Sequence, residues 1–327
     1  MTAKPIGVVH EDDGLIVIDK PAGVPVHPAG RYNYNSVIEI MRAERYYHFT
    51  PFPCNRLDRL TSGVMFVGKT KEAAEGMSRQ LVERTIRKEY IARVMGEFPA
   101  EEITCEEPIL LISPKLGLNR VRPHGKTAKT LFKRIAYYNT GSNMKSDVNG
   151  IPYTADSSNS ISPRNTNMQG YSIVNCSPLT GRSHQIRVHL QFLGFPIAND
   201  PIYCNQKVFG PALARGDDSS SNDANIIDRL SRMGKSEVAE AVAYHDELVG
   251  QYEKAKAEKM TGEVCGICDT PLYSDPGPHE LGIYLHAKKY ECQEGKWTYE
   301  SALPEWALPP HDVDPSKDKV DKAYIEH

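Results

Sequence analysis

The 327-residue sequence has little that would mark a membrane, secreted or strongly basic protein. No apolar run approaches the roughly 18 residues that a spanning helix needs, so we expect no membrane segment. Residues 1–14 include Glu11, Asp12 and Asp13 but no apolar stretch, and therefore predict neither a signal peptide nor a transit peptide. The net charge of −3 excludes a globally basic surface, so any anionic partner must contact local clusters of Lys and Arg.

Cysteine usage indicates the redox compartment. The seven cysteines are odd in number and scattered along the chain, which does not fit a disulfide framework. A reducing, intracellular location is therefore expected. We predict a cytoplasmic protein, with the nucleus and the mitochondrion left open.

Strand patterns outnumber helix patterns. Residues 14–20 and 63–68 are short apolar runs bounded by turn residues, which predict strands. Residues 70–83 have apolar residues at helical spacing after Thr70, a suitable cap, and residues 86–94 alternate with a period of two. Because no βαβ repeat is visible, we predict an α+β fold with a mixed, mostly antiparallel central sheet and flanking helices.

The chain is predicted to be one domain over residues 1–308. Two insertions are expected within it, at about 140–170, which is rich in Ser, Asn and Gly, and at about 205–262, which starts as a loop and then has helical composition. Residues 309–327 form a polar tail, expected to be disordered or loosely docked.

Residues 54–63 form the first segment with chemical potential, Cys-Asn-Arg-Leu-Asp-Arg-Leu-Thr-Ser-Gly. The acid at its centre, Asp58, precedes a turn and a buried strand, which places it on a loop at the edge of a sheet. From these residues alone, Asp58 is equally suited to chemistry and to capping nearby backbone amides.

Residues 178–194 form the second segment, Pro-Leu-Thr-Gly-Arg-Ser-His-Gln-Ile-Arg-Val-His-Leu-Gln-Phe-Leu-Gly. Ser183 or Thr180 is predicted to cap a helix that Gly194 ends. The apolar stripe of this helix leaves a different face for polar side chains, which are His184, Arg187 and Gln191. Two His, two Arg and a Gln within a few residues favour a binding face over a merely solvated one.

Residues 87–90, Arg-Lys-Glu-Tyr, are the third segment. The alternation places Lys88 and Tyr90 on the same side of a strand. A Tyr between apolar neighbours is more often a core residue than a catalytic one, so the local pattern alone favours the core.

In this order, the three segments resemble the RluA-type pseudouridine synthases, which are marked by RLDxxTSG, KxY and TGRxHQIRxHL motifs. The last motif continues here through residues 194–203, and further matches are Lys20-Pro21-Ala22-Gly23, Gly125-Lys126-Thr127-Ala128-Lys129-Thr130 and Tyr284-Leu285-His286-Ala287. Outside the insertions and the tail, the resemblance covers most of the chain, and it is similar to the eukaryotic tRNA position-32 branch. One departure is Asn55, where the family usually has His.

The resemblance implies an RNA pseudouridine synthase that isomerises a uridine in the anticodon stem-loop of tRNA and needs no cofactor. It implies that Asp58 is the catalytic carboxylate, that Arg187 keeps it ionised and that Tyr90 stacks on the uracil. Arg56 is expected to fill the space left by the flipped uridine. Further candidates for RNA or substrate binding are Arg59, Thr61, Lys88, Lys126, Arg182, His184 and Gln185. The expected partner is RNA. The protein is expected to be a monomer and to bind no membrane.

A basic stretch fits this expectation. Residues 120–134 contain six Lys and Arg and no acid, which predicts an RNA contact, although an ordinary charged strand face would look the same.

Three other interpretations deserve weighing. His245-Asp246-Glu247 with Cys265 and Cys268 superficially resembles a zinc deaminase, but Val264 stands where Pro is expected, and we reject it. A structural zinc would need two more ligands besides Cys265 and Cys268. The last alternative is a non-catalytic RNA-binding or folding factor on the same fold, which the presence of Asp58 argues against.

Overall fold

The structure is a computed structural model. It describes residues 5–28, 32, 34–45, 48–139, 170–232, 260–264, 266, 271–273, 281–310, 318–321 and 324. Most of the first expected insertion, residues 140–169, and the middle of the second, residues 233–259, lie outside these ranges. The predicted domain boundaries therefore stay a prediction.

A mixed sheet organises the described residues, with the strand order β1-β2-β4-β13-β5-β10-β9-β15. Its pairs are antiparallel except β4 with β13, as the sequence predicts. Three further strands, β3, β6 and β14, pair alongside this path. The strands of this sheet are β1 (Gly7–Glu11), β2 (Leu15–Lys20), β3 (Phe52–Pro53), β4 (Ser62–Gly68), β5 (Ile86–Met95), β6 (Ile103–Cys105), β9 (Thr130–Tyr138), β10 (Tyr171–Pro178), β13 (Leu285–Cys292), β14 (Thr298–Glu300) and β15 (Lys319–Val320).

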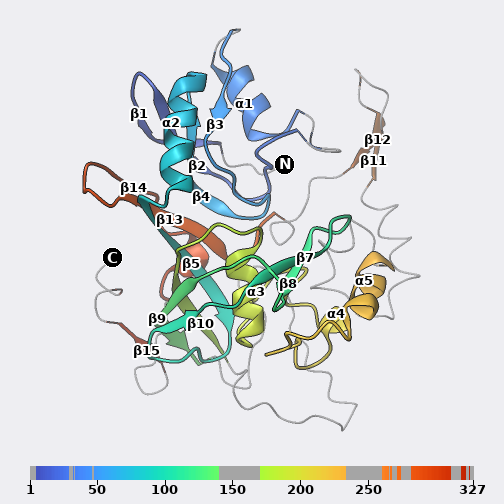
Figure 1. Cartoon of the computed structure of the whole chain (residues 1–327). Helices are drawn as coiled ribbons and strands as arrows, with labels where there is room; N and C mark the ends of the chain where they lie inside the picture. Colours follow the sequence, from blue (N-terminus) through green and yellow to red (C-terminus); the bar gives the residue numbers. More distant parts are fainter. Residues whose placement is uncertain are drawn as a thin grey trace.

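Short helices and two separate hairpins complete the fold (Figure 1). The hairpins are β7 (Ile109–Ser113) with β8 (Leu118–Val121), and β11 (Met260–Val264) with β12 (Pro271–Tyr273). The helices are α1 (Val37–Glu44), α2 (Lys71–Val82), α3 (Gln185–Phe192), α4 (Gln206–Phe209), α5 (Asp223–Arg232) and the 3-10 turn Glu305–Ala307.

The N-terminal half of the sheet packs against α1 and α2 (Figure 1). Strands β2 and β4 are buried almost throughout, which explains why both read as continuous apolar runs rather than alternating ones. The predicted cap of α2 is confirmed, because the Thr70 hydroxyl accepts a hydrogen bond from the backbone N–H of Ala73 at 3.2 Å.

The other half of the sheet packs against α3. Ile186 and Leu190 of this helix join the core that β5 and β10 form, as its apolar stripe predicts. Val188 faces the opposite way, into a second cluster built from the β7–β8 hairpin, α4 and α5. Helix α3 therefore lies between the sheet and this hairpin layer, and both of its faces are buried (Figure 1).

The parallel contact between β4 and β13 depends on Gly63. This residue has φ of +112°, and a Cβ atom there would lie 2.2 Å from the carbonyl oxygen of Ala287. Only glycine permits this approach. The contact brings the Tyr284–Ala287 motif beside the residues that follow Asp58.

Part of the polar tail, which was expected to be disordered or loosely docked, is docked on the sheet. Lys319 and Val320 pair with Tyr137 and Ala136 at the edge of the sheet, and Tyr324 is buried in the adjoining core. A single short strand gave no periodicity by which the sequence could reveal this contact. Among the described residues, no helix is both long and apolar enough to cross a membrane.

Candidate active site

Asp58 lies on the loop between β3 and β4, and buried neighbours hold that loop in place. The backbone N–H of Thr61 donates to the Asp58 carbonyl at 3.1 Å, forming a turn. The fully buried Lys20 amine donates to the carbonyls of Pro21, Val24 and Arg59 at 2.9, 2.8 and 3.3 Å, and Arg59 belongs to this loop. Burial lowers the pKa of Lys20 to about 7. The Lys20-Pro21-Ala22-Gly23 motif thus contacts the acid loop through the Arg59 carbonyl.

Arg187 of α3 joins the acid loop to the segment after this helix. Its Nε and Nη2 atoms donate to the two oxygens of Asp200 at 2.6 and 2.9 Å, a bidentate pair in which Asp200 is fully buried. Its remaining Nη1 donates to Oδ2 of Asp58 at 3.1 Å. The predicted contact between Asp58 and Arg187 is therefore present, while the catalytic role of each residue stays a prediction.

The Asp58 carboxylate is ionised and still accessible. Burial acts to raise its pKa, but the charge and the hydrogen bond of Arg187 oppose burial, and the pKa is lowered below its ordinary value. The side chain retains 28% of its exposure. Its known contacts use Oδ2, and Oδ1 accepts no hydrogen bond from the described residues. The carboxylate is thus partly exposed and has one oxygen without a partner among the described residues.

His184 is the second neighbour of Asp58, with Nε2 at 3.5 Å from Oδ2. The Tyr203 hydroxyl accepts the N–H of Asn119 at 3.2 Å and lies 2.9 Å from Nδ1 of His184, so its own proton can be donated to Nδ1. Burial lowers the pKa of His184 to about 4, which keeps the ring neutral at pH 7. A neutral ring that accepts at Nδ1 carries its proton on Nε2, facing Asp58.

His184 also has an unusual backbone conformation. Its φ of 56° lies in the left-handed region, which is uncommon for a residue with a Cβ, and it occupies the N-cap position of α3 without a capping side-chain bond. Such conformations cluster at functional sites, where the surrounding contacts hold them in place. The predicted caps, Ser183 and Thr180, are not the cap residues of this helix.

Gln185 has a structural role here instead of the RNA contact expected from the sequence. It is 4% exposed, and its amide oxygen accepts from the Thr180 hydroxyl and the Arg182 N–H at 2.7 and 3.0 Å. Its amide nitrogen donates to Lys129 and Thr130 of the neighbouring segment. Both ends of the amide are used within the protein, so Gln185 shapes the loop before α3.

The polar face expected on α3 is likewise buried. Gln191 donates to the carbonyl of Leu213 at 2.7 Å, and His189 contacts Thr130 and the Glu107 carbonyl. Helical spacing could not show this, because the α4 segment and the β7–β8 hairpin cover that face. What remains partly exposed is the N-terminal end of α3, where His184 and Asp58 lie beside the buried Arg187.

Tyr90 approaches the site from β5, and its hydroxyl lies 2.7 Å from that of Tyr290 on β13. Burial raises the pKa of Tyr90 well above its ordinary value, and the nearby Asp58 charge acts in the same direction. Tyr90 is therefore a neutral phenol within electrostatic range of the acid. Lys88, on the same strand, is partly buried beside Gly181, and burial lowers its pKa.

The remaining candidates surround this centre with differing exposure. Arg56 is exposed, and Arg59 lies over the ring of Tyr32 at 5.2 Å. Thr61 is 2% exposed, and its hydroxyl has no partner among the described residues. Arg182 donates from Nε to the Thr127 carbonyl at 2.9 Å. Lys126, one residue before Thr127, is exposed.

The basic stretch 120–134 is mostly committed to ion pairs, which corrects the expectation of a continuous RNA contact. Arg120 and Arg122 are 1% and 3% exposed and bind Asp217 and Asp223 of the second insertion. Lys129 pairs with Glu106, and Arg134 pairs with Glu97. The sequence could not show these partners, because the acids lie far away along the chain. Two exposed lysines remain for an anionic ligand, Lys126 and Lys133.

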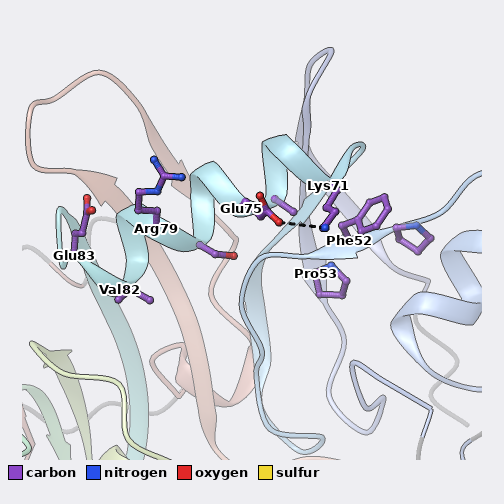
Figure 2. Close-up of a pocket in the computed structure, with 10 residues that line it drawn as sticks. Phe52, Pro53, Lys71, Glu75, Arg79, Val82 and Glu83 are labelled. Carbon is purple, nitrogen blue, oxygen red and sulfur yellow. Dashed lines mark ion pairs between the residues drawn. The ribbon is translucent and has the colours of Figure 1, made fainter.

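The described residues contain no group of three or more metal-binding side chains. Cys265 and Cys268 lie outside them, and a zinc site there stays a prediction. A shallow groove lies elsewhere, between α2 and the residues around β3, where Phe52 and Pro53 face Lys71 and its partner Glu75 (Figure 2). None of the proposed site residues lines this groove.

The geometry can be set beside known proteins. Residues 14–192 match the family described as RNA pseudouridylate synthase. The chain belongs to this family. That range contains Asp58, Tyr90 and Arg187, and the RluA-type resemblance expected from the motifs is confirmed.

Two yeast relatives illustrate the closeness of the match. The chain is 43% identical to the mitochondrial tRNA pseudouridine(32) synthase of Saccharomyces cerevisiae, over 94% of this chain and 60% of that protein. It is 31% identical to the tRNA pseudouridine(31) synthase of the same organism, over 92% of this chain and 69% of that protein. Mouse pseudouridylate synthase RPUSD2 is 35% identical over 94% of this chain and 57% of its own. The chain thus spans about three fifths of several relatives that it matches.

Solved structures agree in fold. The structure of human RNA Pseudouridylate Synthase Domain Containing 1 has a TM-score of 0.52, covering 94% of this chain and 87% of that one, at 17% identity. At this identity the likeness shows the fold alone.

Three residues around the site were missed by sequence reasoning. Asp200 and Tyr203 lie in the matched segment 194–203, so the motif itself was the signal, but nothing local showed that Asp200 binds Arg187. Tyr290 had no signal, because its partners Tyr90 and Asn55 are far away along the chain.

Proposed function

We propose that this chain is an RNA pseudouridine synthase that isomerises a uridine of tRNA without a cofactor. The observation that carries the proposal is the Asp58–Arg187–Asp200 arrangement in a member of this family. Asp200 neutralises Arg187 and holds it in place, and Arg187 in turn keeps Asp58 anionic through one oxygen only, while the other has no partner among the described residues. This is the state that a carboxylate needs in order to act on a sugar.

The reaction breaks the bond between N1 of uracil and C1′ of the ribose and forms a bond between C5 and C1′. N1 gains a proton and C5 loses one, so no oxidant, reductant or external energy is required. Asp58 acts on the sugar, by attacking C1′ or by removing a proton from C2′. Both routes require the ionised carboxylate that the nearby Arg187 maintains.

Neighbouring side chains supply binding and orientation. The ring of Tyr90 offers an apolar face for the uracil, which has to leave its stack at a cost of a few kcal/mol. Arg56, which is exposed, is proposed to fill the vacated space, and Arg59, Arg182 and Lys126 are proposed to contact phosphates. His184, with Nε2 at 3.5 Å from Oδ2, helps to orient the Asp58 carboxylate from the same oxygen that Arg187 contacts.

The target is proposed to be a uridine of the anticodon stem-loop, at position 32. The relative with 43% identity is named for tRNA position 32 and another relative for position 31, which defines the choice to be tested. The chain is proposed to act as a monomer. The expected cytoplasmic location finds no support, since the relative named for position 32 is mitochondrial. We therefore propose either compartment, to be distinguished by imaging the tagged protein in cells.

Tritium release tests the activity directly. Transcribed tRNA with tritium on C5 of its uridines loses the label when C5 bonds to the ribose, and three matched transcripts locate the target: unchanged, with C at position 32, and with C at position 31. We expect release from the first and third only. Release from the second but not the third assigns position 31 instead. RNA binding without release from any transcript favours the non-catalytic folding factor.

A further inference from the structure

Two side chains, Asn55 and Tyr290, connect the acid loop to Tyr90 by hydrogen bonds. Tyr290 belongs to β13, the strand between β4 and β5. The Asn55 amide nitrogen donates to the Tyr290 hydroxyl at 3.5 Å, and this hydroxyl lies 2.7 Å from that of Tyr90. Asn55 is on the acid loop, three residues before Asp58. The loop carrying the carboxylate and the strand carrying the candidate stacking ring thus share one hydrogen-bonded connection.

Tyr290 is a rigid centre for this connection. It is 1% exposed, and its ring meets Phe66 edge to face, with centroids 5.2 Å apart and planes at 87°. Asn55 and Tyr90 are the partners of its hydroxyl among the described residues. The packed ring holds the hydroxyl in place, and leaving it unpaired in the core would be costly.

Asn55 has one amide orientation that satisfies both of its contacts. Its oxygen accepts the backbone N–H of Phe66 at 3.0 Å, which requires the oxygen to face β4. The nitrogen must then face Tyr290. The amide therefore offers an acceptor to the sheet and a donor to the tyrosine pair at the same time.

We propose that Asn55 and Tyr290 are a pair of positioning residues that set the ring plane of Tyr90 relative to the Asp58 carboxylate. The inference rests on the proposed function. A phenol anchored only by its stem can tilt about two side-chain torsions, whereas an anchored hydroxyl fixes the tilt. Because the rate of a positioned reaction falls steeply with small displacements, this anchoring acts on the chemical step rather than on RNA affinity.

Removal of the central hydroxyl is the first test. Tyr290→Phe keeps the ring in its packing and removes only the oxygen, and we expect the single-turnover rate at saturating enzyme to fall about tenfold. The dissociation constant for tRNA should stay within about twofold, because Tyr290 touches no surface. Tyr138→Phe is the matched control: it removes another buried tyrosine hydroxyl, one without a partner among the described residues and in a different core, and should leave the rate unchanged.

A second variant distinguishes positioning from packing. Asn55→Leu is close to asparagine in size but cannot donate to Tyr290, and because it also removes the acceptor for the Phe66 N–H, the melting temperature is measured beside the rate. We expect a similar loss of single-turnover rate, and the double variant with Tyr290→Phe should lose little more than either alone. Losses that multiply in the double variant would overturn the pairing.

Failure of the inference and failure of the proposed function are distinguishable. If the wild-type chain forms no pseudouridine, both fall together. If the wild type is active and Tyr290→Phe reacts at the wild-type rate, only the positioning role falls. A lowered melting temperature with an unchanged rate per folded molecule would also overturn it, because this is the result of a purely structural tyrosine.

Discussion

Buried arginines bind aspartates in two places, at α3 and at the β7–β8 hairpin, and the two clusters use the same kind of ion pair differently. In one, Arg187 binds Asp200 through two nitrogens and reaches Asp58 with the third. In the other, Arg120 and Arg122 surround Asp223, and Asp217 receives the remaining contact.

The difference lies in what each carboxylate has left to offer. Asp223 accepts from the two arginines with both of its oxygens and is 16% exposed. Asp58 makes its known contacts with one oxygen only and is 28% exposed. Arg187, which is already bound by Asp200, therefore holds Asp58 in place through one oxygen and leaves the other without a partner among the described residues. The Arg120–Arg122 cluster instead fastens α5 to the hairpin.

The largest effect is expected from removing the acid of the site, Asp58. Asp58→Ala and Asp58→Asn should each lower the single-turnover rate at least about a thousandfold, because the reacting carboxylate is lost. RNA binding should remain largely intact, which filter binding checks. More than trace activity in both variants would contradict the assignment.

The corresponding change in the other cluster should act on stability. Asp223→Ala leaves two buried arginine charges short of a partner, and we expect the free energy of unfolding to fall by about 3–5 kcal/mol. The rate per folded molecule should be unchanged. Urea unfolding with a parallel activity assay measures both, and an equally large stability loss in Asp58→Ala would remove the distinction between the two clusters.

Arg187→Lys tests whether the site needs the geometry of the arginine or only its positive charge. Lysine keeps the positive charge but cannot bind Asp200 through two nitrogens while reaching Asp58 with a third. We expect the rate to fall about a hundredfold, as the carboxylate loses its fixed direction. An unchanged rate would show that charge alone suffices.

Three histidines, one of them in the site, are expected to make the stability of the fold depend on pH. His189 and His286 are buried and His184 is partly buried, and burial lowers the pKa of each to about 4. Unfolded histidines titrate near 6.5, so between pH 6.5 and 4 the unfolded chain binds protons that the folded chain does not. Stability should therefore fall as the pH drops through this window, by up to about 1.4 kcal/mol per pH unit for each ring.

Urea unfolding at pH 7 and pH 5 measures this dependence. His184→Gln removes the contribution from the site and should flatten the slope, whereas Asp223→Ala should not alter it. Stability that rises on acidification would contradict the buried, neutral state of these rings.

The smallest effect concerns the basic stretch. Lys126→Ala should weaken tRNA binding severalfold and reduce the slope of log affinity against log salt by about one, the amount for one phosphate contact. Lys133→Ala, which removes another exposed lysine, tests whether the contact is particular to Lys126. Equal effects of both variants would indicate a diffuse basic field.

Local patterns predicted the main elements. The runs 14–20 and 63–68 are β2 and β4, Thr70 caps α2, and Gly194 with φ of +87° ends the last turn after α3. These features depend on neighbours within a few residues, so sequence alone contains the information. Mistakes arose where distant segments cover a surface, as with the polar face of α3 and the basic stretch 120–134.

Motifs and periodicity are local properties of the chain, so the residues alone were enough to predict the family, the main strands and helices, and the candidate acid. Only the tertiary structure decided which charges remain available. Arg187 meets Asp58 from 129 positions away, and Tyr290 meets Tyr90 from 200 positions away. Whether a side chain is free or committed depends on partners that folding brings together, and burial then sets the pKa values that no spacing reveals.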